Sequence, residues 1–460
     1  MPTASASVAR DPATDRGGAC LEWHLGHDLS SEIVKRTHVD DVYLMGFGDV
    51  PPEVGRLTDY SFRARIALTP KTHGHHKLSL ASIGPCRMFI DEVLTQEQSG
   101  AFEENDTLFF TYGSGEAITT VHGGRENLHC SNRLPLPRQT APRRLLPLMD
   151  PMEDKFQGFR LGFEEASTAD CPKEAAEIAR HCASAVVVVG RDKEWETEGQ
   201  DIPIFELPGE QVRLIRQVAA TCKRTIVVVQ AGTPVCLELW IHEVQAVLYT
   251  WYQGQELGNA ALDVISGAVN PSGRLPVTFL RRLQDCPAFS SFPREQMQSR
   301  YAEGLYVGYR WWDLVGTKPH FPIGYGLSYT TFEHAPEAIS TIVLTEDTTL
   351  TVKVRVENTG GCKVPGRETI IVFYTQSFPT RLTCPVKQIC GFGKSAILGS
   401  NEAHIVEVQV DFRAFGMFDP EQAQWVVDSG SRFDILVGTT AQDAKAAWEV
   451  VAPVDISWVI

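Results

Sequence analysis

Several features of nucleic-acid-binding and membrane proteins are missing from this sequence. Basic residues are not in excess, because 57 Asp and Glu outnumber 42 Lys and Arg and give a formal net charge of -15. An acidic surface repels phosphate groups, so we expect no nucleic-acid partner. No apolar run approaches the length of a membrane span, so we expect no membrane partner either.

Cysteine pairs at metal-ligand spacing are also missing. The eleven cysteines include no Cys-x-x-Cys pair, and Cys182, Cys222 and Cys236 fall in or beside apolar helix or strand patterns. This distribution is typical of free, buried thiols in a reducing compartment rather than of disulfides or a zinc site. Residues 1–19 have no apolar core of the kind that a secretory signal needs. We therefore predict a cytoplasmic protein with a disordered tail over residues 1–19.

Motifs for nucleotide cofactors and metals are lacking as well. No Gly-x-Gly-x-x-Gly follows a predicted strand and there is no phosphate-binding loop, so we expect no cofactor. The run His73-Gly-His75-His76 has no Cys, Asp or Glu at ligand spacing. Since adjacent histidines point in different directions, we predict a surface turn there rather than a metal site.

The hydrophobic pattern predicts a multidomain protein of the α/β plus all-β class. Residues 20–165 alternate apolar and polar side chains over short runs, which predicts a β-sandwich with an irregular, Pro-rich and Arg-rich excursion at residues 125–154. Residues 166–333 alternate helical and buried-strand patterns, which predicts an α/β domain with a mostly parallel sheet. Residues 334–460 return to short alternating runs, which predicts a second β-sandwich.

The elements of the α/β domain are expected in the order helix, strand, helix, strand, strand, helix. Helices are predicted at residues 172–182, 208–220 and 256–266, and strands at residues 185–189, 225–229 and 246–249. The loops that follow parallel strands gather along one edge of a sheet, which is where open α/β sheets bind their ligands.

The most informative stretch runs from Ala185 to Asp201. Four valines follow Ala185, which fits a strand buried on both faces, and Gly190 ends the strand. The loop that follows surrounds Trp195 with carboxyl groups. These acidic residues are Glu194, Glu196, Glu198 and Asp201. An indole can pack on a sugar ring, and a carboxyl group beside apolar surface can keep its proton and act as a general acid. From these residues alone, a solvated acidic loop with Trp195 as its core anchor is an equal alternative.

Six stretches, in order along the chain, closely resemble glycoside hydrolase family three, the β-glucosidase group. They are Trp195-Glu-Thr-Glu-Gly199 with Asp201, Leu207-Pro-Gly209, Trp251-Tyr-Gln-Gly-Gln-Glu256, Asn270-Pro-Ser-Gly-Arg-Leu-Pro-Val-Thr-Phe279, Tyr306-Val-Gly-Tyr-Arg310 and Phe321-Pro-Ile-Gly-Tyr-Gly-Leu-Ser-Tyr-Thr-Thr-Phe332. The first sandwich resembles the protective-antigen-type domain of many fungal β-glucosidases. The second resembles their fibronectin type III-like domain.

The resemblance implies that Glu198 is the general acid/base, and we assign Trp195, Glu196 and Asp201 to substrate binding. It also implies a retaining mechanism with two carboxyl groups about 5 Å apart. The attacking Asp of the family lies on a Ser-Asp-Trp type motif in an N-terminal (β/α)8 barrel, and these 460 residues contain neither. The sequence also has Ile202 where the family usually has Arg, and Tyr325 where it has the His of Phe-Gly-His-Gly.

Two hypotheses for function follow. The first is a β-glucosidase-like hydrolase of β-glucosides that uses Glu198 and takes its nucleophile from a barrel-bearing partner chain or from a substitute carboxylate, Glu194, Glu196 or Asp201. The second is a barrel-less, non-hydrolytic descendant that binds or transforms a small molecule, for example in specialised metabolism, with the same loop. A truncated gene copy without function and a homo-oligomer are left open.

Several other residues of these stretches are predicted to be structural. Trp251, Trp311, Trp312 and Tyr325 are expected in core or interdomain packing. The run Asn270-Pro-Ser-Gly273 has Pro and Gly in the usual positions of a turn, and we interpret it as architecture.

Overall fold

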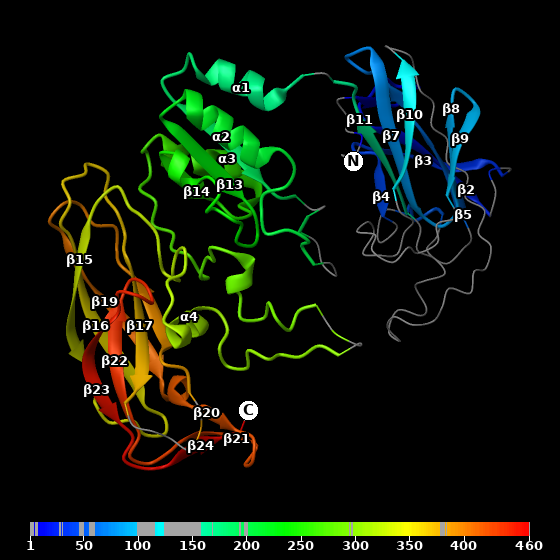
Figure 1. The fold of residues 1–460 in the computed structure, drawn as a ribbon. Coiled ribbons are helices and arrows are strands. Elements are labelled where there is room, and N and C mark those ends of the chain that lie inside the picture. The colour runs from blue at the N-terminus through cyan, green and yellow to red at the C-terminus, as the bar shows by residue number, and fades with distance from the viewer. Residues whose placement is uncertain are drawn as a thin grey trace. The chain divides into compact units, whose positions relative to one another are not determined.

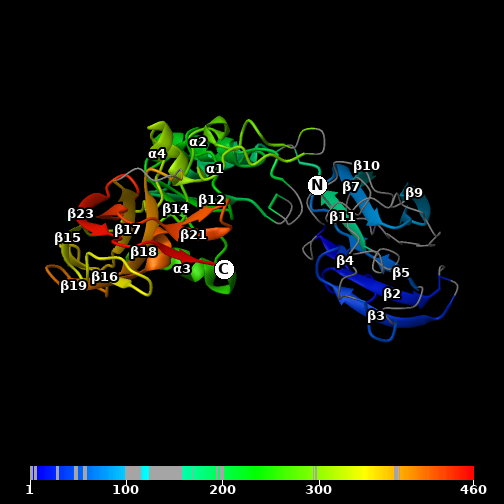
Figure 2. The same cartoon turned by 90° about the horizontal axis from the view of Figure 1, so that it is seen from below.

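The computed structural model describes residues 4, 8–26, 29, 31–45, 50–54, 60–98, 116–123, 158–167, 169–192, 195–196, 201–293, 295, 298–377, 382 and 384–459. The chain divides into two compact units (Figures 1 and 2). The first consists of Met1–Glu174 with Asp192–Ile202, and the second of Ala175–Arg191 with Pro203–Ile460. Within the described ranges, no helix is both long enough and apolar enough to cross a membrane.

The first unit is built from antiparallel strands around one core. Its strands are β1 Ala9–Arg10, β2 Ala19–Leu25, β3 Ile33–Val39, β4 Tyr43–Met45, β5 Tyr60–Arg65, β6 Ala67–Leu68, β7 Gly74–Ile83, β8 Cys86–Ile90, β9 Val93–Gln98, β10 Ala117–Gly123 and β11 Gly158–Glu164. The two larger sheets have the orders β10-β7-β11-β4 and β3-β2-β5. Phe62 joins them, because its ring lies 5.3 Å from Trp23 and 5.4 Å from Phe159 between centroids. The predicted β-sandwich is thus observed.

Two expectations for this unit differ from the structure. Part of the expected disordered tail is ordered: Ala9 lies in β1, pairs with Leu68 of β6 and is fully buried, because small residues pack closely against the core. The histidine run is not a surface turn beyond Gly74. His76 lies in β7, is 1% exposed, and accepts a hydrogen bond at Nδ1 from the Ala166 amide at 2.9 Å. The excursion at residues 125–154 lies outside the described residues.

The second unit begins with the α/β part. Its helices are α1 Cys171–Ala179, α2 Gln211–Thr221, α3 Leu257–Ile265 and α4 Tyr309–Val315. The first residues of α1, up to Glu174, belong to the first unit. Its strands are β12 Ala185–Gly190, β13 Thr225–Gln230 and β14 Ala246–Tyr249. The three strands pair in parallel in the order β12-β13-β14. Helix α2 places Ile215 and Val218 in the core with Val187, Val189 and Val227. The expected parallel sheet is therefore present, with α2 beside β13 (Figure 1).

Strand β12 is not buried on both faces, as its run of valines had suggested. Val187 and Val189 are 6% and 5% exposed, whereas Val186 and Val188 are 47% and 62% exposed. The side chains of a strand alternate between faces, so α2 covers one face while the described part of the chain leaves the other open. The apolar sequence correctly predicted a strand, but the prediction that both faces of this strand are buried is wrong.

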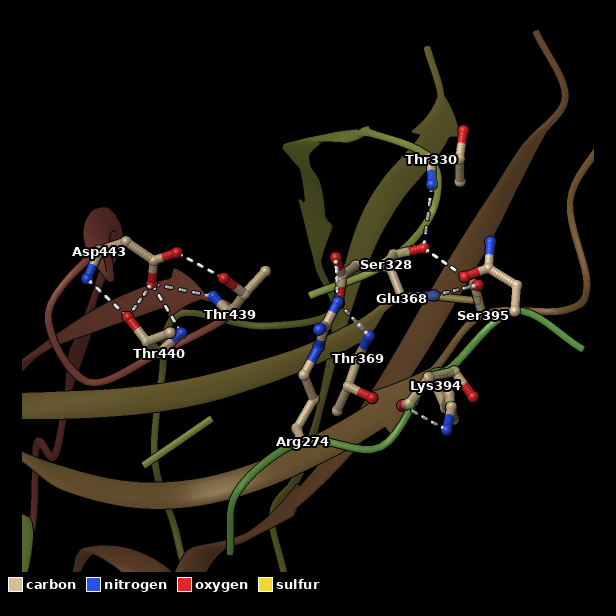
Figure 3. Close-up of polar contacts among 12 residues, drawn as sticks. Arg274, Ser328, Thr330, Glu368, Thr369, Lys394, Ser395, Thr439, Thr440 and Asp443 are labelled. Atoms are coloured by element: carbon tan, nitrogen blue, oxygen red, sulfur yellow. Dashed lines mark hydrogen bonds and ion pairs between the residues drawn. The ribbon is translucent and has the colours of Figure 1, made fainter. Parts of the chain in front are cut away.

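The second unit continues into a second β-sandwich. Its strands are β15 Phe332–Ile339, β16 Thr349–Asn358, β17 Thr369–Gln376, β18 Gln388–Lys394, β19 Ala403–Asp411, β20 Met417–Asp419, β21 Gln424–Val427, β22 Arg432–Gly438, β23 Lys445–Val451 and β24 Ile456–Trp458. Two sheets, β15-β16-β19 and β18-β17-β22-β23, enclose the core, and β20-β21-β24 forms a third. Polar contacts, drawn in Figure 3, join this sandwich to the α/β part through Arg274 and Lys394.

Candidate active-site loop

The predicted catalytic loop is described only in part. Glu198, the predicted acid/base, and Glu194 lie outside the described residues. The loop begins with a turn in which the amides of Trp195 and Glu196 both donate to the Asp192 carbonyl, at 3.0 and 2.9 Å. Trp195 and Glu196 are half-buried, and Asp201 is exposed. Their assignment to substrate binding therefore stays a prediction.

Arg191 anchors the loop at both ends. Its side chain is buried directly after β12, where Nη2 donates to the backbone carbonyls of residues 204–206 at 2.9, 3.0 and 3.1 Å. Nη1 donates to Thr233 Oγ1 at 3.0 Å. One guanidinium thus links the residue before the loop to the residues after it. Since hydrogen bonds to charged groups are worth about 1.5–3 kcal/mol each, this anchor is strong.

Gly190 allows the end of β12 to lie close to β13. A Cβ atom at this position would lie 1.9 Å from the Gln230 carbonyl oxygen of β13, so no larger residue fits. The side-chain amide of Gln211, at the start of α2, binds the same glycine twice. It accepts from the Gly190 amide at 2.7 Å and donates to the Gly190 carbonyl at 2.9 Å. The end of β12 is therefore held in place by its neighbouring strand and by α2.

The loops after the other two strands are tied to the same point. Tyr252, which follows β14, donates its hydroxyl to the Arg191 carbonyl at 3.1 Å. Tyr249 donates to the Thr233 carbonyl at 2.6 Å, and Thr250 Oγ1 donates to the Val229 carbonyl at 3.1 Å. The carboxyl ends of β12, β13 and β14 thus form one hydrogen-bonded rim, at the edge where the sequence predicted a ligand site.

Three of the aromatic residues that were predicted to be structural pack against other parts of the chain. Trp251 has a left-handed backbone with φ of 55° and contacts Tyr249 edge to face at 4.9 Å. Trp312 in α4 is 8% exposed, and Tyr325 stacks on Phe321 at 4.5 Å. These rings hold the framework together. Among the described residues, no group of three or more His, Cys, Asp or Glu side chains could hold a metal ion.

Arg191 is the residue beside the predicted site that sequence reasoning missed. The sequence did contain a signal for Arg191, because a charged residue directly after an apolar strand needs a polar partner if it is buried. Its partners are backbone carbonyls, however, and these carry no side-chain signature. The arrangement holds the residues directly before and after the predicted loop at the carboxyl edge of a parallel sheet.

Two family descriptions match this chain. The Glycosyl hydrolase family 3 C-terminal domain matches residues 117–329, and the Fibronectin type III-like domain matches residues 368–441. The first match contains the rim, and the second contains strands β17 to β22 of the second sandwich.

Curated relatives are similar over most of this chain. Beta-glucosidase B of Emericella nidulans is 34% identical over 406 residues, which cover 85% of this chain and 46% of the relative. A beta-glucosidase of Rhizobium radiobacter is 31% identical over 95% of this chain and 52% of its own length. The chain therefore spans about half the length of the curated relatives that it matches.

Solved structures show the same similarity. Beta-glucosidase from Kluyveromyces marxianus in complex with glucose superposes with a TM-score of 0.85 at 27% identity, over 99% of this chain and 53% of that one. Beta-glucosidase 3B from Thermotoga neapolitana in complex with alpha-D-glucose gives a TM-score of 0.56 at 31% identity, over 63% of this chain and 40% of that one.

Proposed function

Because this chain belongs to glycosyl hydrolase family 3, whose C-terminal domain and fibronectin type III-like domain it carries, we propose that it supplies the acid/base half of a β-glucosidase active site. The ligand is a β-glucoside. Glucose is bound in the solved structures of similar enzymes from Kluyveromyces marxianus and Thermotoga neapolitana, which supports this class of ligand.

The observation that carries the proposal is the anchoring of the acidic loop by Arg191. A general acid must be held close to the oxygen that it protonates, and small displacements cost large factors in rate. Arg191 binds the carbonyls of residues 204–206 and is bound in turn by Tyr252 through its own carbonyl. Glu198 lies between these two fixed ends in the sequence. A solvated loop without function would not need such an anchor.

The proposed chemistry uses two carboxyl groups. Glu198 donates its proton to the glycosidic oxygen while a second carboxylate attacks the anomeric carbon and forms a glycosyl-enzyme bond. Glu198 then takes a proton from water, and the water displaces the enzyme carboxylate. In this proposal the attacking carboxylate lies on a barrel-bearing polypeptide.

Glu198→Gln tests this role. We co-express the chain with the N-terminal part of Emericella nidulans Beta-glucosidase B that precedes the matched region, and measure hydrolysis of aryl β-glucosides. We expect turnover only with the partner, and a loss of about 10²–10⁴-fold in kcat for Glu198→Gln. The loss should be larger for a poor leaving group, which depends more on protonation. Glu210→Gln, at the exposed start of α2, is the matched control.

No turnover with the partner, or equal rates for the Glu198→Gln and Glu210→Gln variants, would overturn this function. The second candidate would then remain: a non-hydrolytic protein that binds a small molecule with the same loop. Glucoside binding that survives Glu198→Gln without any turnover would establish it.

We also propose that the protein works in the cytoplasm. The described cysteines are free thiols. Cys222 and Cys236 are buried, whereas Cys182, which the sequence had suggested to be buried, is exposed. Free thiols persist in a reducing compartment, which supports this location. No step of the proposed chemistry uses a cofactor.

A further inference from the structure

Two free cysteines lie close together where helices α1 and α2 lead into the parallel sheet. Cys182 lies shortly after α1 and is exposed, whereas Cys222 directly follows α2 and is buried. The two helices are neighbours, because Thr221 Oγ1 of α2 donates to the Ala176 carbonyl of α1 at 2.9 Å (Figure 1). Although the cysteines are 40 residues apart in the sequence, Cys222 Sγ lies 3.8 Å from the Cys182 carbonyl oxygen.

The register of the sheet places the two cysteines at equivalent positions on adjacent chains. Strands β12 and β13 pair in parallel from Ala185, which lies opposite Thr225. The chains are still side by side just before the strands, because the Ala185 amide donates to the Arg224 carbonyl at 3.1 Å. Cys182 and Cys222 each lie three residues before this first pair. Since neighbouring strands are about 4.8 Å apart and the Cα atoms of a disulfide lie about 4.4–6.8 Å apart, the spacing of the two chains suits a disulfide.

The two thiols are held only weakly in the reduced protein. Cys182 Sγ donates to the Ile178 carbonyl in the last turn of α1 at 3.4 Å, and Cys222 Sγ donates to the Cys182 carbonyl. A thiol is a weak hydrogen-bond donor, so neither bond strongly opposes a change of rotamer. The side chain of an exposed residue changes rotamer within nanoseconds. Rotation of Cys182 can therefore bring its sulfur toward Cys222, whose sulfur already lies against the Cys182 backbone.

The two cysteines differ in their access to solvent. Cys182 is exposed, whereas Cys222 is 4% exposed and belongs to the core cluster that contains Ile215 and Val218. An oxidant in solution therefore reaches Cys182 first. An accessible thiol beside a second, protected thiol is the arrangement in which the first is oxidised and the second resolves it.

We propose that Cys182 and Cys222 are a redox-sensitive pair that forms a reversible disulfide on exposure to hydrogen peroxide. The Cys182 thiolate attacks one peroxide oxygen, the O–O bond breaks, and a sulfenic acid and hydroxide form. The Cys222 thiolate then attacks the Cys182 sulfur, the S–O bond breaks, and hydroxide leaves as the disulfide forms. The hydroxide ions take up the two thiol protons. Two thiols are thus oxidised by two electrons, and one peroxide is reduced to two molecules of water.

The disulfide joins the chain that enters β12 to the chain that enters β13. A cross-link between these chains removes conformations from the unfolded state and opposes the separation of the two strands. It lies at the amino ends of the strands, whereas the rim is formed by their carboxyl ends, so the predicted loop is not modified. A small thiol such as glutathione reverses the bond by thiol–disulfide exchange. The proposal does not depend on glucoside hydrolysis.

Peptide mass spectrometry tests the bond. The reduced full chain is treated with a small excess of hydrogen peroxide, its remaining thiols are blocked with N-ethylmaleimide, and it is digested with trypsin without reduction. Cleavage after Arg180 and Arg216 gives peptides 181–191 and 217–223, each with a single cysteine. We expect a linked peptide with a mass about 2 Da below that of the two peptides together, because two hydrogen atoms are lost. Dithiothreitol should abolish it.

Variants separate the roles of the two thiols. In Cys222→Ala the Cys182 sulfenic acid has no resolving partner, so its trapping by dimedone should rise at least about tenfold relative to the wild-type chain. In Cys182→Ser, whose substitution is exposed and should not disturb folding, Cys222 should remain a thiol. Cys171→Ser, which removes an exposed cysteine at the other end of α1, is the matched control and should form the linked peptide as the wild type does.

Amide hydrogen exchange tests the consequence of the bond. In the oxidised chain, exchange in β12 should slow at least about tenfold, and in oxidised Cys171→Ser it should slow equally. Unchanged exchange in β12 would overturn the proposed joining of the strands. Absence of the linked peptide, oxidation of Cys182 to a sulfinic acid in its place, or a disulfide from Cys182 to any other cysteine or to a second copy of the chain would overturn the proposed pair.

Discussion

Arg274 and Glu368 form a bidentate ion pair that joins the α/β part to the second sandwich (Figure 3). Arg274 Nη2 donates to Glu368 Oε1 at 2.7 Å and to Oε2 at 2.8 Å, and Nε donates to Oε1 at 3.0 Å. The two side chains are 8% and 9% exposed. Lys394 adds a bond from Nζ to the Ser272 carbonyl at 2.8 Å. The run Asn270-Pro-Ser-Gly273, interpreted from sequence as architecture, therefore lies at the junction of two parts.

Removal of one member of the Arg274–Glu368 ion pair should strongly reduce the stability of the protein. Arg274→Met leaves the buried Glu368 carboxylate without its cation, which typically destabilises a protein by about 3–5 kcal/mol. The control is Arg432→Met, which removes an exposed pair with Glu449 and should cost about 0–1 kcal/mol. Scanning calorimetry of both variants measures the difference. Equal decreases in melting temperature for Arg274→Met and Arg432→Met would contradict the prediction. Adding Glu368→Leu to Arg274→Met should restore part of the lost stability, and a double variant that is no more stable than Arg274→Met would also contradict the prediction.

Gly324→Ala should be much more damaging than Gly430→Ala. Both glycines have left-handed backbones, with φ of 87° and 82°, so the backbone strain is similar. A Cβ at Gly324 would lie 2.1 Å from the Thr439 carbonyl oxygen, whereas one at Gly430 meets nothing within 4 Å. Thr439 cannot move easily, because Asp443 Oδ1 accepts its amide at 3.0 Å. We expect Gly430→Ala to lower the free energy of unfolding by about 1–2 kcal/mol through backbone strain alone, and Gly324→Ala to lower it clearly more. The midpoints of urea unfolding measure the difference.

Arg191→Met should release the acidic loop. The variant loses several charge-assisted hydrogen bonds. Because a loss of about 1.4 kcal/mol changes an equilibrium constant tenfold, the population in which the loop is locally unfolded should rise at least about tenfold. Cleavage by a glutamate-specific protease reports this directly, because the loop contains Glu194, Glu196 and Glu198. Arg180→Met, which removes an exposed helical pair with Glu177, should leave the rate of cleavage unchanged. If both variants are cleaved at the wild-type rate, Arg191 does not anchor the loop.

His320 should make stability depend on pH. Burial lowers its pKa below 6.5, with smaller contributions in the same direction from Arg281 and His242, although Glu238, 3.2 Å from Nδ1, opposes the shift. The unfolded chain therefore takes up this proton at a higher pH than the folded chain. The stability contribution is complete above about pH 6.5 and is lost as the pH falls toward the folded pKa.

The expected measurement is a smaller free energy of unfolding at about pH 5.5 than at about pH 7.5. His320→Gln should reduce this difference, whereas His242→Gln, whose side chain is 77% exposed, should change it less. A pH dependence that is the same in all three proteins would assign the effect to other groups.

Much of the local structure could be predicted because its causes are local. The apolar run after Ala185 and the run Ala246–Tyr249 became strands β12 and β14. Alternation and turn residues are properties of neighbours in sequence. The family was identified in the same way, from stretches that each read continuously.

The contacts that organise the rim and the junction could not be predicted, because their partners lie far apart in sequence. Arg191 reaches Thr233, and Arg274 reaches Glu368, which is 94 residues away. No periodicity records such pairs. The valines of β12 make the same point, since their composition specifies a strand but not which faces are covered. Burial is a property of what packs against a residue, and only the folded arrangement shows that Val186 and Val188 are exposed.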